Sequence, residues 1–584
     1  MNTAQALQQK APREILYLQT DKPSYIVGDT IWFSAYLLDA HELTPSRLSG
    51  IVYIELLSPF GGLMKRYAIH LNYGHGYAQM PISKDLSPGN YHIRAYTRWM
   101  ENFPDSLFFQ KEISIAGGAQ NWLMNINSYQ AFHKLRQDSV SMKFFLKTQT
   151  GETAANKFVM ININNDKGKT IIAKKLMTKS DGSLSINFNV DDNKKNKKLS
   201  LNILDEAAIG RISYPINLSP QKNKIDVQFL PESGHIIEGV KNKIAFKAID
   251  ENGSGIDVQG IIKNNSGDSV TSFSSLYKGM GTFNFMPKEG EKYYAELNNK
   301  DTFYLPHVDS LGTIIHTDVL SDKDSIIVFI HETSNRQSDE YFLFAEYKGY
   351  KLYGAKLVMK DRVMRIAINK SIFPTGINSV TLIGESGQIL NERSFFINHY
   401  DNLNVTIQSP KDSILARDSI PVHIKVTDQN NAPVEGIFSL AITDNQQVKK
   451  DAVNDENILS YFLLSSDLKG AIETSGYYFS DTTIKKQKAL DNLMLTQGFV
   501  KYDWDTTKMK TLPEPQFFIS GKATSLFGKP LKKANITLLG NGKQVILKDT
   551  TTDDKGEFLF KDFPLFDTSG FVVQARNKKI NPSA

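Results

Sequence analysis

Residues 15–38 constrain the fold more than any other stretch, because two apolar runs flank a short segment that favours a turn. Pro23 fixes its φ angle and has no N–H to donate, and Gly28-Asp29 supplies turn residues. The runs at 15–19 and 31–38 are rich in β-branched and aromatic residues, as strands are. We predict two strands of a β-sandwich. The second should be covered on both sides, because large side chains occupy both of its faces: Ile31, Phe33, Ala35 and Leu37 alternate with Trp32, Ser34, Tyr36 and Leu38.

The letters of this segment are more specific than its pattern. Thr20-Asp21-Lys22-Pro23, followed by Tyr25, Gly28 and Phe33, resembles the signature TDKP.Y..G..V.F near the start of the second domain in the alpha-2-macroglobulin family. The resemblance implies that a macroglobulin-type β-sandwich opens here. The signature carries no catalytic group, so it implies architecture alone. The composition of this segment alone would fit any β-sandwich hairpin.

Length and composition limit the classes of protein. A chain of 584 residues is too long for one core, and domain sizes indicate roughly four to six units. Aromatic residues make up 11%, which excludes a disordered chain. The net charge of +6 is small, and no basic block is dense enough to follow a nucleic acid. The densest basic run, at 193–198, is interpreted as a solvated hairpin tip, with a small anion-binding patch as the alternative.

Cysteine content and hydropathy limit the chemistry and the cellular location expected for the chain. The chain has no cysteine, which excludes disulfides, cysteine-ligated zinc, thiol nucleophiles and an internal thioester within it. No apolar run approaches the roughly 20 residues of a membrane helix. Residues 1–6 lack the pattern of a signal peptide. Either the protein is cytosolic, or a signal peptide was removed. We favour the second and expect a place in the cell envelope, in the periplasm or at the outer membrane.

The predicted fold class is all-β, a string of about six immunoglobulin-like or macroglobulin-type β-sandwiches with a short helical insertion near 454–498. Strands are expected, among others, at 158–164, 420–426 and 436–442, with an Asp-Gly hairpin turn at 178–184. The predicted boundaries are a linker at 1–14, then sandwiches at 15–116, 117–220, 221–306, 307–400 and 401–515, and a last domain at 516–584.

Two helices interrupt the fifth unit. Ile458, Tyr461, Phe462 and Leu464 recur at helical spacing, and so do Ala489, Leu490, Leu493, Met494 and Gln497. Asp481, Thr482 or Thr483 could cap the second helix, and Gly498 suits its end. We predict that this segment packs on the fifth sandwich through its apolar face.

The last unit has a second family resemblance. Gly528-Lys529-Pro530-Leu531, Ala534-Asn535-Ile536 and Thr552-Asp553-Asp554-Lys555-Gly556-Glu557-Phe558 together resemble a carboxypeptidase regulatory-like domain. Such domains often precede the plug of TonB-dependent outer-membrane receptors in Bacteroidetes-like bacteria. The resemblance implies one more strand after 571–576, so we expect the polypeptide to continue beyond Ala584.

No stretch supports a catalytic, cofactor-binding or metal site, and none is predicted. His331-Glu332 lacks the second histidine of a zinc helix, so we interpret it as an ordinary loop. There is no Gly-x-Ser-x-Gly elbow. Gly540-Asn541-Gly542-Lys543 suits a hairpin turn, and Asp553-Asp554 supplies too few oxygens for calcium.

These features favour a non-enzymatic, extracytoplasmic scaffold or partner-binding region of a TonB-dependent receptor-like protein. Its partners would be proteins of the outer membrane or periplasm, without nucleic acid. A glycan- or protein-binding adhesin is the first alternative, and it would need exposed aromatic side chains among Trp32, Trp99, Trp122 and Trp504. A thioester-less protease inhibitor of the macroglobulin type is the second.

Overall fold

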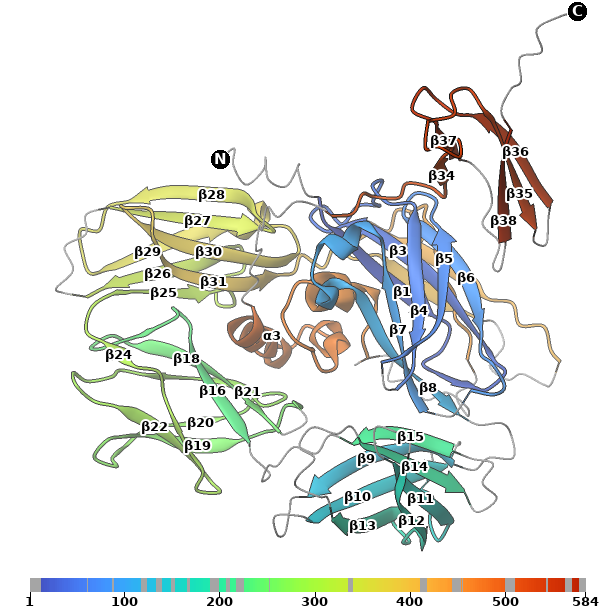
Figure 1. The fold of residues 1–584 in the computed structure, drawn as a ribbon. Coiled ribbons are helices and arrows are strands. Elements are labelled where there is room, and N and C mark those ends of the chain that lie inside the picture. The colour runs from blue at the N-terminus through green and yellow to red at the C-terminus, as the bar shows by residue number, and fades with distance from the viewer. Residues whose placement is uncertain are drawn as a thin grey trace, which may run out of the picture. The chain divides into compact units, whose positions relative to one another are not determined.

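The computed structural model describes the residues 12–59, 61–86, 89–116, 123–132, 139–148, 153–164, 169–189, 199–205, 211–216, 225–250, 253–333, 340–409, 417–443, 453, 455–498, 510–541, 545–561 and 570–576. These residues form many small antiparallel sheets, which confirms the predicted all-β string of sandwiches (Figure 1). The chain divides into two compact units. Unit 1 comprises Met1–Ala11, Pro220–Phe438 and Lys450–Asp505, and unit 2 comprises Pro12–Ser219, Ser439–Lys449 and Thr506–Ala584.

The first sandwich, in unit 2, contains residues 15–38. One of its sheets has the order β1-β3-β6, and the other contains β5, β4, β7 and β8, with β2 added in parallel to β8. Pro23 precedes β2, and Gly28 has a φ of 90°, which accounts for glycine in this turn. The strands are β1 (Glu14–Thr20), β2 (Ser24–Ile26), β3 (Thr30–Asp39), β4 (Ile51–Leu57), β5 (Leu63–His70), β6 (His75–Pro81), β7 (Gly89–Tyr96) and β8 (Phe109–Ala116).

Strand β3 is central in its sheet, but it is not covered on both sides as predicted. Ile31 and Phe33 are buried, whereas Trp32 on the other face is 57% exposed. The hydrogen-bonded neighbours β1 and β6 protect the edges of β3 and leave that face open at Trp32, whereas Ser34, Tyr36 and Leu38 are half-buried. Large side chains on both faces of a strand therefore did not indicate a second layer here.

The second sandwich, also in unit 2, has sheets of order β13-β10-β9 and β12-β11-β14-β15. Gly182 has the positive φ, 73°, expected of the Asp-Gly turn. The turn does not close a hairpin, because β12 and β13 belong to different sheets. Ser213 pairs in parallel with Gly89 and so joins this sandwich to the first. The strands are β9 (Leu123–Phe132), β10 (Ser139–Thr148), β11 (Phe158–Asn164), β12 (Thr170–Met177), β13 (Ser183–Asn189), β14 (Leu199–Asp205) and β15 (Arg211–Ile216).

The third sandwich, in unit 1, packs sheet β16-β18-β21 on sheet β20-β19-β22-β23. Its core is aromatic, with Phe246 and Phe273 in edge-to-face contact at 5.0 Å between ring centroids. A two-residue strand, β17, pairs in parallel with β24. The strands are β16 (Asp226–Pro231), β17 (Ile236–Ile237), β18 (Asn242–Ile249), β19 (Gln259–Asn264), β20 (Ser269–Ser274), β21 (Met280–Phe285), β22 (Tyr293–Leu297), β23 (Thr302–Tyr304) and β24 (Val308–Asp309).

The fourth sandwich follows directly, with sheets β25-β26-β29 and β28-β27-β30-β31. Its core is aliphatic, with Phe373 and Phe395 against it. Gly376 begins β30 after the turn at 373–375. The strands are β25 (Thr313–Asp318), β26 (Ser325–Glu332), β27 (Tyr341–Tyr347), β28 (Tyr350–Leu357), β29 (Val363–Asn369), β30 (Gly376–Gly384) and β31 (Ile389–Ile397).

The described residues of the predicted fifth sandwich form one two-stranded sheet, β32 (Asn404–Gln408) with β33 (His423–Thr427). Residues 436–442 form no strand, so that prediction was wrong. Ile437 and Leu440 there are 57% and 51% exposed. The apolar content of residues 436–442 is typical of a strand. No neighbouring strand pairs with their backbone in the described part of the chain.

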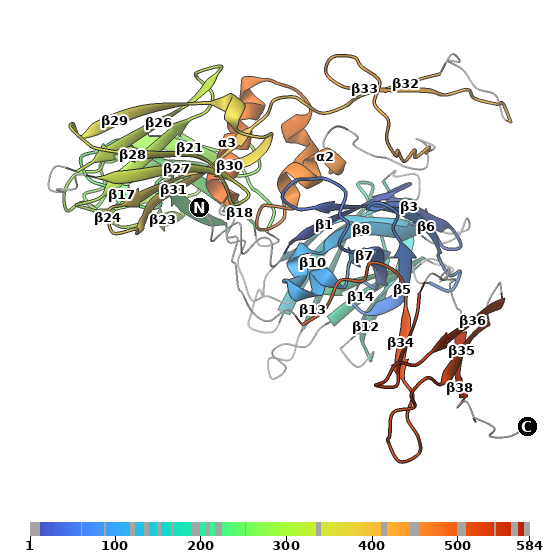
Figure 2. The same ribbon diagram turned by 90° about the horizontal axis from the view of Figure 1, so that it is seen from above.

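The two predicted helical segments are present. The first consists of α2 (Ile458–Ser460) and the π-helical turn η5 (Tyr461–Ser465), and the second is α3 (Ile484–Gln497), with Thr483 as N-cap and Gly498 as C-cap. In the described part of the chain, neither segment packs on β32 or β33 of the fifth unit. Helix α3 contacts β18 and β21 of the third sandwich and β31 of the fourth, beside which it lies in Figure 2.

The last sandwich, in unit 2, has sheets β34-β37 and β36-β35-β38. The residues before it are fixed to the first sandwich: Glu514 accepts hydrogen bonds from Tyr53 (2.7 Å) and Arg98 (3.0 Å). Gly50 is required there, since a Cβ would lie 1.9 Å from the Pro515 carbonyl oxygen. The strands are β34 (Ile519–Lys522), β35 (Asn535–Asn541), β36 (Val545–Thr551), β37 (Glu557–Phe560) and β38 (Gly570–Arg576).

Candidate functional site

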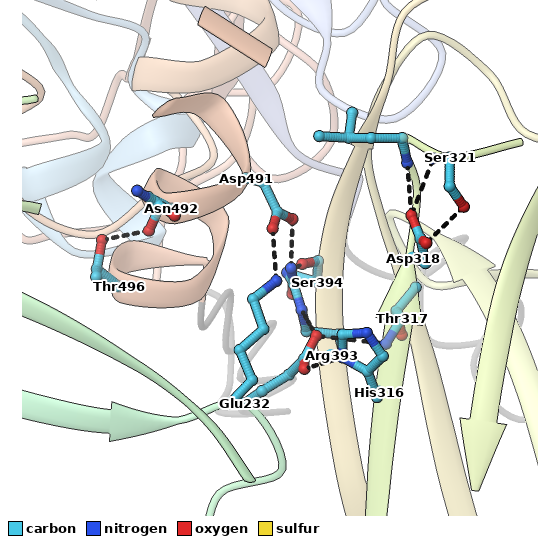
Figure 3. A network of polar contacts seen from close by, with 12 residues as sticks. Glu232, His316, Thr317, Asp318, Ser321, Arg393, Ser394, Asp491, Asn492 and Thr496 are labelled. Atoms are coloured by element: carbon cyan, nitrogen blue, oxygen red, sulfur yellow. Dashed lines mark hydrogen bonds and ion pairs between the residues drawn. The ribbon is translucent and has the colours of Figure 1, made fainter. Parts of the chain in front are cut away.

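An open pocket of about 900 Å³ lies in unit 1, where the third sandwich, the fourth sandwich and helix α3 meet. Its lining comes from all three parts, among them Lys243 of β18, His316 of β25, Phe329 of β26 and Asp491 of α3. Several of these side chains belong to a network of buried charges, shown in Figure 3. This network is the candidate functional site.

Arg393 of β31 is the centre of the network. Its Nε donates a hydrogen bond to Glu232 (3.0 Å), and its Nη2 forms an ion pair with Asp491. The Arg393 side chain is only 2% exposed. Burial by itself would lower the pKa of this guanidinium, but the charges of Asp491 and Glu232 raise it, so Arg393 is held as a cation.

Glu232 follows β16 and is a residue of the third sandwich that contacts Arg393. One carboxylate oxygen accepts from Arg393 and from the Thr317 backbone N–H (3.3 Å), and the other lies 2.6 Å from His316 Nδ1. Burial by itself would raise the pKa of Glu232. The hydrogen bond with His316 and the positive charge of Arg393 hold this pKa below its usual value, so the carboxylate is ionised.

Asp491 carries helix α3 into the network. It pairs with Arg393 and accepts a 3.0 Å hydrogen bond from Lys243 of the third sandwich. Burial by itself would raise the pKa of Asp491, but Arg393 and Lys243 lower it. Two carboxylates thus balance two cations, and each charge has a partner, as buried charges require.

The sequence of α3 explains why Asp491 points at this network. Ala489, Leu490, Leu493 and Met494 form its buried face and pack against Met280 and Phe396 of the two sandwiches. The segment before α3 makes a second contact with the third sandwich. Tyr277 and Tyr477 stack at 3.8 Å, and Glu473 pairs with Lys278 at 3.2 Å.

A second buried polar cluster joins the same two sandwiches. Asn391 of β31 donates to the carbonyl oxygens of Ser233 (3.1 Å) and Thr313 (2.9 Å). The Ser233 hydroxyl donates to the Ile315 carbonyl oxygen at 2.8 Å, and the Ile315 N–H donates back to that hydroxyl at 3.0 Å. The third sandwich, the fourth sandwich and α3 are therefore held together by directional bonds as well as by apolar packing.

The ion pairs of the network join separate elements of unit 1. The pair Glu232–His316 matches the acid and imidazole of a hydrolytic triad, but no serine or threonine side chain bonds to His316 among the described residues. Both carboxylates are already committed to cations. The described part of the chain also holds no cluster of three residues suited to a metal ion, and none of its helices has the length and apolar content for crossing a bilayer.

The sequence predicted no site residue, and the network was missed. His331-Glu332, interpreted as a loop, ends strand β26, and His331 lines the pocket. The basic run at 193–198 lies outside the described residues. One signal could have found the network: in β31 the buried positions alternate as Asn391, Arg393, Phe395 and Ile397. A charged residue at an inward position of a strand needs a buried partner.

No family model matches the chain, and no curated protein sequence matches it. Solved structures of bacterial alpha-2-macroglobulins and of an adhesion protein match it. The trypsin-activated alpha-2-macroglobulin of Escherichia coli is 12% identical over 71% of this chain and 33% of its own, with a TM-score of 0.30. The Salmonella alpha-2-macroglobulin reacted with methylamine is 10% identical over 97% and 39%, with a TM-score of 0.27. A tandem-repeat region of a large adhesion protein is 12% identical over 66% and 100%, with a TM-score of 0.14.

The chain thus spans a third to two-fifths of the length of the bacterial macroglobulins it matches. At these TM-scores the similarity carries no inference about activity or partners.

Proposed function

We propose that the chain is a non-enzymatic, extracytoplasmic scaffold that binds protein partners within a TonB-dependent receptor-like outer-membrane protein. The observation that supports this proposal best is the Arg393 network, which joins two sandwiches and a helix through buried ion pairs. Residues far apart in the sequence are joined: Glu232 and Arg393 are separated by 161 positions. A rigid body of this kind suits a spacer or docking element.

The setting rests on the two family resemblances. Residues 15–116 resemble a macroglobulin-type domain, and residues 516–576 resemble the regulatory-like domain that precedes receptor plugs. The proposed location is the cell envelope, in the periplasm or at the outer membrane. Cross-linking in living cells followed by fractionation tests this directly. Recovery with an outer-membrane β-barrel is expected, and recovery in the cytosol without an envelope partner would refute the proposal.

Rigidity of unit 1 can be measured separately. Because the chain has no cysteine, Ser269→Cys and Glu385→Cys would place single spin labels on the third and fourth sandwiches. We expect one narrow distance distribution between the labels, and a broad one after Arg393→Met. Arg365→Met, at an exposed arginine of β29, is the matched control and should keep the narrow distribution. A broad distribution in the unsubstituted protein would contradict a scaffold role for the network.

A protease inhibitor that captures its target covalently makes a distinct prediction. Covalent capture through an internal thioester needs a cysteine, and this chain has none. Incubation with methylamine or with a protease should therefore leave the mass of the intact chain unchanged. A mass increase would support covalent capture over the scaffold, whereas a thioester-less inhibitor would leave the mass unchanged and lower the activity of the added protease.

The adhesin alternative is favoured by one observation. It requires exposed aromatic side chains, and of the two tryptophans in the described residues Trp32 is 57% exposed and Trp99 is 6% exposed. Trp122 and Trp504 lie outside the described residues.

A further inference from the structure

The outward face of β3 and β6 in the first sandwich carries a row of aromatic side chains. On β3 and β6, Trp32 stands opposite Gln79, Ser34 opposite Tyr77, and Tyr36 opposite His75. Trp32 and Tyr77 are 57% and 78% exposed. The ring centroids of Tyr36 and His75 are 5.2 Å apart, and those of His75 and Tyr77 are 6.2 Å apart. The rings of Tyr36, His75 and Tyr77 therefore lie side by side, with Trp32 further along β3 on the same face, and we call these side chains the aromatic face.

The aromatic face is uncharged, although 22% of the residues in the chain are charged. Burial lowers the pKa of His75, so its imidazole is neutral at pH 7. The other outward side chains of β3 and β6 between the rings are Ser34 and Gln79, which carry hydroxyl and amide groups. Among the described residues, neither of these side chains takes part in a hydrogen bond within the protein. They are available to a ligand that can both donate and accept.

The face is small. Residues four apart along a strand are separated by about 13 Å, and two neighbouring strands together are roughly 10 Å wide, so the platform covers on the order of 130 Å². A stable protein interface needs about 800 Å² on each partner. The platform alone is therefore too small for a stable protein partner or for a second copy of this chain, and it suits a narrow ligand.

We propose that the aromatic face, formed by Trp32, Tyr36, His75 and Tyr77 with Ser34 and Gln79 between them, binds a neutral glycan chain. The flat C–H faces of pyranose rings stack on aromatic rings, and sugar hydroxyls bond to hydroxyl and amide side chains. An acidic or basic ligand would find no opposite charge on this face. The inference does not depend on the scaffold proposal, because the aromatic face and the Arg393 network lie in different compact units.

The test is binding of the full chain to neutral hexasaccharides: cellohexaose, xylohexaose, mannohexaose and laminarihexaose, measured by calorimetry. We expect at least one to bind, and the double variant Trp32→Ala/Tyr77→Ala to bind it at least about tenfold more weakly. Tyr304→Ala, at an 81% exposed tyrosine of β23, is the matched control and should bind normally. All variants should keep their melting temperature, because exposed positions contribute little to stability.

Tryptophan fluorescence supplies a second readout. Binding should protect Trp32 from acrylamide quenching, and the protection should be absent in Trp32→Phe. Absence of binding to all four sugars would overturn the proposal, and so would binding that the double variant leaves unchanged. Salt-sensitive binding to acidic glycans alone would overturn the assignment to neutral chains. A concentration-dependent dimer that the double variant abolishes would show that the face is a protein contact instead.

Discussion

Two buried glutamates, Glu55 in unit 2 and Glu232 in unit 1, are each paired with arginine, but in different ways. Glu55 of β4 faces Arg66 and Arg94 directly across the neighbouring strands β5 and β7. Those arginine side chains are 52% and 29% exposed. Glu232 and Arg393 are both only 2% exposed and come from different sandwiches. The first arrangement reinforces one sheet, whereas the second decides how separate elements are joined.

This difference indicates which of the two glutamate–arginine pairs contributes more to stability. A half-exposed arginine can be replaced in part by water, so its loss costs little. A buried arginine cannot, and removal of Arg393 leaves Glu232 with only the hydrogen bond to His316 and Asp491 with only Lys243. We expect sensitivity to mutation to follow this contrast rather than the number of ion pairs.

The largest effect is expected for Arg393→Met. Glu232 would keep only His316 as a partner, and Asp491 only Lys243. Removing one member of a buried ion pair typically costs about 3–5 kcal/mol. Urea unfolding followed by hydrogen exchange on peptides from β31 and α3 measures this loss within unit 1. Arg365→Met should leave the same peptides unchanged. Equal protection in Arg393→Met and the unsubstituted protein would mean that the network contributes nothing to the joint.

The next effect tests apolar packing instead of charge at the same joint, the contact of α3 with the third and fourth sandwiches. Leu493 of α3 is 1% exposed and packs in the cluster shared by the two sandwiches. Leu493→Ala should cost about 2–5 kcal/mol, seen as a lower melting temperature of unit 1. Ile484→Ala, at a 56% exposed position of the same helix, should shift stability by less than about 0.5 kcal/mol. If Leu493→Ala melts normally, this face of α3 is not part of the joint.

Acid should weaken the joint as well. Glu232 and Asp491 have pKa values lowered in the folded state, so their stabilisation is present above the unfolded pKa values of about 4. It is lost as the pH falls through the lower folded-state values. We expect the urea midpoint of unit 1 to decrease below about pH 4, and Glu232→Gln to reduce the slope of that decrease. An unchanged slope would show that Glu232 does not titrate with folding.

The smallest effect is expected for Arg66→Ala in unit 2. Glu55 would keep Arg94 at 2.6 Å and the Tyr96 hydroxyl at 3.0 Å, so its carboxylate stays paired. The loss of stability should be at most about 1 kcal/mol. Unfolding of peptides from β4 and β5 checks it. A loss as large as that of Arg393→Met would remove the distinction between the two glutamates.

The sequence by itself determined most of the local structure. Pro23 and Gly28 predicted the connection to β3, and the spacing of Ala489, Leu490, Leu493 and Met494 predicted α3. These predictions succeed because turn chemistry and the period of apolar residues act over a few neighbouring positions. The domain boundaries remain predictions.

Tertiary structure decided the rest. An apolar helix face is buried wherever an apolar surface is available, so its spacing could not distinguish the fifth unit from the two sandwiches that α3 contacts. Residues 436–442 alternate like a strand, yet a strand also needs a paired backbone, which their own sequence does not supply. Arg393 needed a partner 161 positions away, and Trp32 needed the absence of a second layer. Burial and pairing depend on which distant elements meet, and no local pattern contains that information.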